Sequence, residues 1–112
     1  RDRREAVRAT SIDDTAIRER ITVDHARFGV IWCPHTAVGA ETWANLASSE
    51  RDAHPWCVVA TASPAKFPEI VEPLIGRKVP VPPALAELLG RPTRRESLDA
   101  SLAALREALL QR

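Results

Sequence analysis

The sequence predicts an α/β fold, in which helices cover a small, partial three-layer sheet. Short apolar runs alternate with segments of helical periodicity, the order expected when parallel strands need covering helices on both faces. The strongest run, WCVVAT at 56–61, is apolar without alternation, as in a strand buried on both faces. The chain has 112 residues, of which 45% are hydrophobic and 28% charged. This composition suits one globular domain or part of one.

The first expected elements are a short strand at 6–10 and a helix at 12–27. Ser11 is the expected N-cap of this helix, and Asp14 three residues later forms an acidic variant of the capping box. Gly29 is a suitable end for the helix. The apolar residues of the helix share one face, namely Ile12, Ala16, Ile17 and Ile21.

A second strand and helix are expected at 30–33 and 35–47. The VIWC run supplies the strand, and Pro34 suits the first turn of the helix. The third strand is the apolar run at 56–61. Three short strands make a small sheet, since the mean sheet contains about five or six strands. We therefore expect the neighbours of the third strand to lie outside this sequence.

Three more helices are expected, at 66–75, 84–89 and 98–110. The first is closed by Gly76. Its apolar residues fall at helical spacing, namely Phe67, Ile70, Val71, Leu74 and Ile75. Leucines at similar spacing predict a buried face on the last helix, namely Leu98, Leu102, Leu105 and Leu109.

Charge balance and cysteine usage exclude several classes of function. Sixteen basic and fifteen acidic residues leave a formal net charge of +1, and the arginines are scattered, which disfavours a nucleic-acid or anionic-membrane partner. No run approaches the roughly 18 apolar residues of a membrane span, and the start lacks the apolar core of a signal peptide. Two cysteines without a secretory signal suggest reduced thiols. We expect a soluble, cytoplasmic protein, and the absence of methionine, including at position 1, suits a segment of a longer chain.

A thiol and an imidazole flank a proline in WCPHTA, which raises the hypotheses of a nucleophile or a metal site. Cys33 and His35 are neighbouring ligands without a second cluster. Cys57 lies in a predicted strand, and His54 completes no metal-binding spacing. We therefore predict no metal site and expect His35 to stabilise the turn by hydrogen bonding.

Three polar residues follow the strongest predicted strand, namely Thr61, Ser63 and Lys66. Open α/β sheets bind their ligands at this end of a strand. An alternative for Ser63 is that it only caps the turn before Pro64. Lys66 raises the hypothesis of a Schiff-base lysine, but the four glycines never cluster into a phosphate-binding loop. Chemistry alone favours a surface lysine or one that holds an anion.

Two motifs resemble the threonine synthase family. TASPAKF at 61–67 is similar to the family's Thr-Ala-His-Pro-Ala-Lys-Phe motif, and PHTA at 34–37 is similar to its Pro-His-Thr-Ala motif. Their order and spacing agree, and the resemblance covers essentially the whole chain as the carboxyl-terminal segment of the family. Ser63 departs from the family's usual histidine, and Cys33 from a common aspartate. Because serine lacks an imidazole, no catalytic task is assigned to Ser63, and no catalytic residue is expected within this segment.

The resemblance implies the C-terminal part of a fold-type II, tryptophan-synthase-like lyase that uses pyridoxal 5'-phosphate. Such an enzyme converts O-phospho-L-homoserine and water to L-threonine and phosphate in threonine biosynthesis. Thr61 matches the hydroxyl that meets the pyridine nitrogen, and Lys66 is a weaker candidate for binding the substrate's phosphate. In this family the Schiff-base lysine and the cofactor-phosphate loop precede the segment. We therefore expect the chain to be inert without its N-terminal partner, the missing upstream part, and the oligomeric state stays open.

A second hypothesis is a non-catalytic α/β binding or scaffold module derived from this family. Such a module keeps the packing of the segment but not the chemistry. The departures at Ser63 and Cys33 are the observations that favour it. The upstream reading frame distinguishes the two hypotheses, because only the enzyme needs a glycine- and serine-rich loop and a lysine there.

Overall fold

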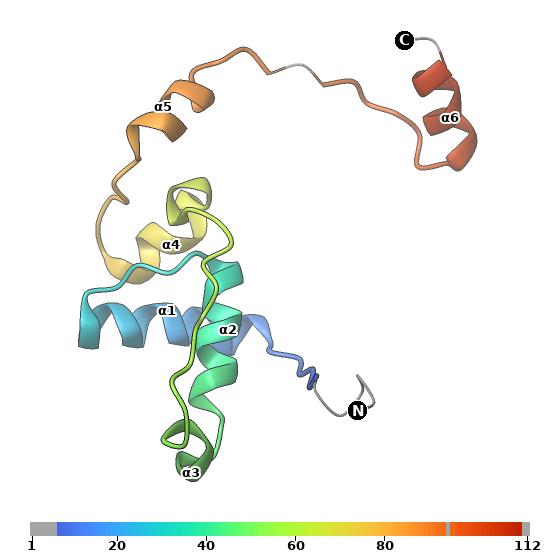
Figure 1. The fold of residues 1–112 in the computed structure, drawn as a ribbon. Helices are drawn as coiled ribbons and strands as arrows, with labels where there is room; N and C mark the ends of the chain where they lie inside the picture. Colours follow the sequence, from blue (N-terminus) through green and yellow to red (C-terminus); the bar gives the residue numbers. More distant parts are fainter. Residues whose placement is uncertain (1–6, 94, 111–112) are drawn as a thin grey trace. The chain divides into compact units, whose positions relative to one another are not determined.

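The computed structural model describes residues 7–93 and 95–110 of the chain. The chain divides into two compact units, Arg1–Pro82 and Pro83–Arg112 (Figure 1). The N-terminal unit contains, in order, α1 (Asp14–Phe28), α2 (Pro34–Ala44), α3 (Ser48–Arg51), the short 3-10 helix η2 (Pro64–Lys66) and α4 (Pro68–Ile75). The C-terminal unit contains α5 (Pro83–Leu89) and α6 (Leu102–Leu110).

Helix α1 has a defined cap at each end. Asp13 is the N-cap, because its carboxylate accepts a hydrogen bond from the backbone N–H of Ala16 at 2.8 Å. The prediction of Ser11 as the cap is therefore wrong. Gly29 ends the helix in the left-handed conformation, with φ 69°, and its N–H donates to the carbonyl of His25 at 2.9 Å.

The core of the N-terminal unit forms where α1 packs against both α2 and α4. Figure 1 shows α2 crossing α1. Ile21 on α1 and Val71 on α4 are each 0% exposed. Helix α2 contributes two small buried residues, Ala37 and Ala40. Because the distance between packed helices depends on side-chain size at the contact, these alanines allow α2 to lie close to its neighbour.

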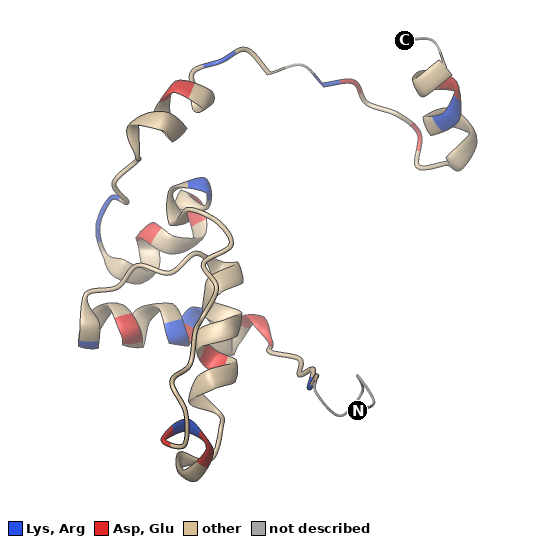
Figure 2. Cartoon of the chain, viewed as in Figure 1, with Lys and Arg blue, Asp and Glu red and all other residues tan. Residues whose placement is uncertain are grey.

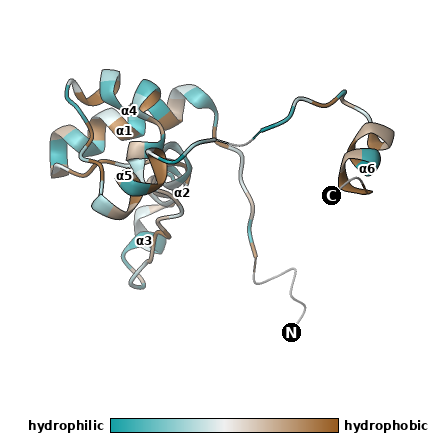
Figure 3. Cartoon of the chain, turned by 90° about the horizontal axis from the view of Figure 1, so that it is seen from above, coloured by the Kyte–Doolittle hydropathy of each residue, from teal (hydrophilic) through white to brown (hydrophobic). Residues whose placement is uncertain are grey.

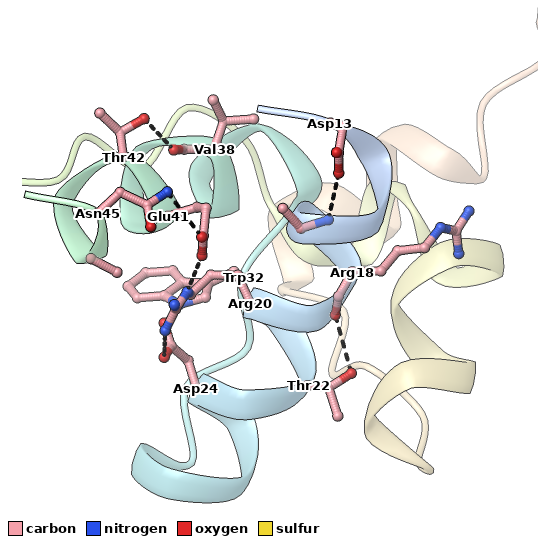
Figure 4. A network of polar contacts seen from close by, with 12 residues as sticks. Asp13, Arg18, Arg20, Thr22, Asp24, Trp32, Val38, Glu41, Thr42 and Asn45 are labelled. Carbon is pink, nitrogen blue, oxygen red and sulfur yellow. Dashed lines mark hydrogen bonds and ion pairs between the residues drawn. The ribbon is translucent and has the colours of Figure 1, made fainter. Parts of the chain in front are cut away.

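Arg20 ties α1 to α2 through a network of polar contacts (Figure 4). Its guanidinium donates to Glu41 on α2 at 2.7 Å and to Asp24 on α1 at 3.0 Å. The Trp32 indole donates to the other oxygen of Asp24 at 2.8 Å, so this buried carboxylate is satisfied on both oxygens. Burial opposes the charge of Arg20, but hydrogen bonds to Glu41 and Asp24 outweigh that cost and raise the pKa of Arg20.

Charged residues are spread over the helices of the N-terminal unit. Acidic and basic residues alternate along α1 in Figure 2. Two further ion pairs join Arg8 to Glu50, and Lys78 to Glu72 at 2.7 Å.

Across residues 7–93 and 95–110, no helix combines the length and the apolar character needed to cross a membrane.

The predicted sheet is absent from the residues that the structure describes, which form helices and irregular segments only. This finding overturns the α/β fold class and the partial three-layer sheet. It also overturns the three predicted strands at 6–10, 30–33 and 56–61, of which residue 6 lies outside the described residues. The unit is instead held together by packing between helices.

Residues 53–62 explain why the third strand does not form. In the described ranges, none of their backbone groups bonds to another backbone group, whereas a strand needs a ladder of such bonds to a neighbour. The run predicted to be buried on both faces is exposed, by 45% at Trp56 and 70% at Val59. Apolar composition favours a strand only where a second strand is available to pair with it.

The C-terminal unit has an exposed apolar surface. Figure 3 shows hydrophobic residues along α6. The leucines predicted to form a buried face are exposed in the structure, namely Leu98 by 47%, Leu102 by 83%, Leu105 by 47% and Leu109 by 64%. The prediction of a buried face is therefore wrong for these leucines, and the helix begins at Leu102 rather than at the predicted Leu98.

Glu72 holds the segment that follows α4. Gly76 ends this helix with φ 67°. The Glu72 carboxylate accepts a hydrogen bond from the Lys78 ammonium at 2.7 Å and another from the backbone N–H of Val79 at 3.1 Å. The hydrogen bond from Lys78 has the largest effect and that from Val79 the next, and together they lower the pKa of Glu72. They fold the chain back so that Val79 is buried.

Replacing Ile21 with alanine should lower the free energy of unfolding by about 2 to 5 kcal/mol, because it opens a cavity between packed helices. Urea unfolding followed by circular dichroism measures the loss. Val23→Ala is the control, since Val23 lies on the same helix but is 40% exposed. Equal losses for the two variants would show that α1 does not carry the core.

Stability should fall as the pH is lowered through the pKa of Glu72. Its folded pKa lies below the unfolded value of about 4.3, so the unfolded state binds more protons, and the stabilisation present above this value is lost at lower pH. Urea midpoints from about pH 6 to pH 3 should decline less steeply for Glu72→Gln than for the wild type. Glu69→Gln, an exposed change on the same helix, is the control. Parallel slopes for Glu72→Gln and wild type would contradict this prediction.

Candidate functional site

The first motif forms the start of α2. Cys33 is the N-cap, and its sulfur accepts a hydrogen bond from the backbone N–H of Thr36 at 3.4 Å. Pro34 occupies the first turn, as predicted. Cys33 and Thr36 are only 1% and 2% exposed. The chain therefore enters the helix with a buried sulfur and a buried hydroxyl beside each other.

The second motif forms the turn that leads into α4. Ser63 caps η2, because its hydroxyl accepts a hydrogen bond from the backbone N–H of Ala65 at 3.3 Å. The alternative that Ser63 caps this turn is confirmed. Ala65 is buried, whereas Lys66 is exposed. The turn thus anchors one small side chain in the protein and presents the next one outward.

The structure brings the two motifs together. The backbone N–H of Thr61 donates to the hydroxyl oxygen of Thr36 at 3.3 Å, across 25 positions of sequence. The rings of His35 and Phe67 lie 5.1 Å apart at an angle of 54°, a tilted arrangement that aromatic pairs favour. The first motif therefore contacts the beginning and the end of the second one.

Two of the predicted site residues present their functional groups outward. Thr61 and Lys66 are exposed. Within residues 7–93 and 95–110, neither the Thr61 hydroxyl nor the Lys66 ammonium makes a hydrogen bond or an ion pair to another side chain or backbone group. Both groups are thus available to a ligand, while the Thr61 backbone is held by Thr36.

Thr36 is the site residue to which the sequence assigned no function. Its position in the PHTA motif is visible in the sequence, but the motif says nothing about the contact with Thr61. A hydroxyl residue three positions after an N-cap, on the buried side of a helix, is a signal that a polar partner is needed there. The identity of that partner requires the three-dimensional structure.

The thiol and imidazole of the first motif are separated by their contacts. The Cys33 sulfur takes part in the helix cap, while the His35 ring packs on Phe67. His35 therefore stabilises the turn through ring packing, since no hydrogen bond joins its side chain to the described residues. In the described ranges, no group of three or more histidine, cysteine or acidic residues is arranged to hold a metal ion.

Two grooves lie on another part of the N-terminal unit. Both are lined in part by Trp43, Trp56 and Val58, and one of them also by Arg8. Neither is lined by Thr61 or Lys66. Grooves of this kind are the usual first choice for a binding site, but here the two sequence motifs meet elsewhere.

Comparison with known proteins assigns the chain to a family. The family described as "Threonine synthase, C-terminal" matches residues 36–109 of the 112. The chain belongs to this family. The resemblance predicted from the two motifs is therefore confirmed.

Two proteins similar to this chain are both named "Threonine synthase". That of Serratia marcescens is 30% identical over 96% of this chain and 25% of its own length. That of Methylobacillus glycogenes is 32% identical over 83% of this chain and 19% of its own length. The chain thus spans 19% to 25% of the length of these two relatives, and no solved structure matches it.

The two departures from the threonine synthase motifs both fall at capping positions. Cys33 caps α2, where the family's common aspartate is one of the preferred N-cap residues. Sulfur is a weaker acceptor than a carboxylate, but it serves the same backbone N–H. Ser63 caps η2. Both departures thus fall at residues that cap a helix in this chain.

Replacing Cys33 with alanine should lower the free energy of unfolding by about 1 kcal/mol, because it removes the N-cap of α2. Cys33→Ser retains a capping oxygen and should recover most of this loss. Chemical unfolding measures both variants. The control is Cys57→Ala, an exposed change that should stay within about 0.5 kcal/mol of the wild type. A loss for Cys33→Ala no larger than the control's would contradict the capping assignment.

Proposed function

We propose that this chain is the C-terminal part of a threonine synthase, which converts O-phospho-L-homoserine and water to L-threonine and phosphate. The hydrogen bond between Thr61 and Thr36 carries the proposal, because it joins the two motifs of the family into one site. Family membership supports the reaction, and the fraction of the relatives' length that the chain spans supports its being one part of the enzyme.

Thr61 is proposed to contact the pyridine nitrogen of pyridoxal 5'-phosphate. Its exposed hydroxyl without a partner in the described residues fits such a contact, as does the fixed backbone beneath it. The cofactor supplies an electron sink for negative charge that develops on the substrate's carbon atoms. A neutral hydroxyl, unlike a carboxylate, does not force the ring nitrogen to stay protonated. Thr61 therefore tunes how strongly the ring withdraws electrons.

Lys66 is proposed to bind the phosphate of the substrate. Its ammonium is exposed and without an acidic partner in the described ranges. A lysine recognises phosphate as a point charge. The buried Ala65 beside it keeps the turn in place. Lys66 is not assigned to the Schiff base, which in this family is formed by a lysine in the upstream part of the enzyme.

The segment alone is proposed to be inert. The Schiff base and the cofactor-phosphate loop are supplied by the upstream part, with which Thr61 and Lys66 complete the active site. The alternative of a non-catalytic scaffold module rested on the departures at Ser63 and Cys33. Both residues cap helices, so their side chains have a structural explanation that does not require the loss of catalysis.

Replacing Thr61 with valine in the full-length enzyme should shift the absorbance maximum of the bound cofactor and lower kcat by about tenfold, which corresponds to about 1.4 kcal/mol. The fold should be unchanged, because only the exposed hydroxyl is lost. Thr61→Ser keeps the hydroxyl and should behave as the wild type.

Thr22→Val is the matched control for this experiment. Its hydroxyl donates to the Arg18 carbonyl within α1 at 3.1 Å, away from the motifs (Figure 4). A wild-type spectrum and rate for Thr61→Val would refute the ring contact. A purified full-length protein without bound cofactor would refute the proposed function itself.

A further inference from the structure

The backbone of Thr61 makes one hydrogen bond to α2. The N–H of Thr61 donates to the hydroxyl oxygen of Thr36 at 3.3 Å. No other backbone group of residues 53–62 hydrogen-bonds to another described residue. The neighbouring residues Val59 and Ala60 are exposed. The nearby Val58 is half-buried and lies close to Gly39 of α2, and the hydrogen bond from Thr61 is the polar contact that adds to this packing.

The acceptor is itself rigidly placed. Thr36 is 2% exposed, and its hydroxyl oxygen lies 3.1 Å from the Cys33 sulfur. Its backbone N–H is bound to the same sulfur at 3.4 Å. A β-branched side chain has few χ1 choices in a helix, and the contacts of the Thr36 hydroxyl oxygen with the Cys33 sulfur and with the Thr61 N–H fit one of them. Helix α2 is in turn anchored on α1 through Ala37 and Ala40.

We propose that Thr36 is a positioning residue that sets the placement of Thr61 against the cofactor ring. The inference rests on the proposed function, which places Thr61 at the pyridine nitrogen, and adds the group that holds it there. The buried hydroxyl of Thr36 transmits the fixed position of α2 to a segment that has no strand neighbour in the described residues. Thr36 itself touches neither cofactor nor substrate.

Loss of the Thr36 hydroxyl should move Thr61 and, through it, slow the reaction. The N–H of Thr61 loses its acceptor, so the turn is free to shift relative to α2. Misplacing a group that orients a reacting centre lowers the rate of the chemical step. The change acts on the chemical step, so kcat falls more than KM changes. A purely structural function of Thr36 would lower stability without moving the cofactor spectrum.

Thr36→Val in the full-length enzyme tests the inference, because valine has the shape of threonine without the hydroxyl. We expect a shifted cofactor absorbance maximum and a decrease in kcat of up to about tenfold, no larger than the loss expected for Thr61→Val. Thr36→Ser should restore both. Thr36→Ala is measured in parallel, so that the test does not depend on the folding of one variant. The matched control is Thr42→Val, which removes a hydroxyl on the same helix that donates to the Val38 carbonyl at 2.8 Å.

A double mutant distinguishes failure of this inference from failure of the proposed function. If Thr36 acts through Thr61, the effects of Thr36→Val and Thr61→Val are not additive, and the double mutant resembles Thr61→Val alone. Additive effects, or a wild-type spectrum in both Thr36→Val and Thr36→Ala, would overturn the inference while the effect of Thr61→Val stands. A silent Thr61→Val in an enzyme that binds the cofactor would instead refute the ring contact.

Discussion

The close packing of α2 on α1 is the constraint on which the N-terminal unit depends. Ala37 and Ala40 bring the helices together, and the bond from Arg20 to Glu41 fixes them in relation to each other. A helix held along its length has a fixed first turn. That turn carries Thr36, so the core of the unit determines where the second motif lies.

The site combines rigid support with an open surface. The sulfur of Cys33 and the hydroxyl of Thr36 are buried and in contact, and the Thr36 hydroxyl in turn accepts the N–H of the exposed Thr61. The Thr61 hydroxyl and the Lys66 ammonium are exposed and without side-chain or backbone partners in the described ranges. Such an arrangement is the one expected for the ligand contacts proposed for Thr61 and Lys66.

The incorrect prediction of a sheet has a definite physical origin. Apolar runs such as that at 56–61 are equally suited to a strand and to any other apolar contact, because hydrophobicity has no direction. Strand formation depends on hydrogen bonds to a neighbour, and residues 53–62 make none to other backbone groups in the described ranges. Helices are different in this respect, since their backbone bonds are internal to the segment. The same difference explains why the helix α6 was predicted while the predicted burial of its leucines is wrong.

The sequence by itself determined the family, through the spacing of two motifs, and the local features that depend on neighbouring residues. Pro34 at the start of α2, Gly29 and Gly76 at the ends of α1 and α4, and the cap at Ser63 belong to this class. Only the tertiary structure decided that Thr36 accepts the N–H of Thr61, and that no strand forms among the described residues. Capping and helix bonding act over a few residues and leave a pattern in the sequence, whereas contacts between distant segments depend on how the helices pack.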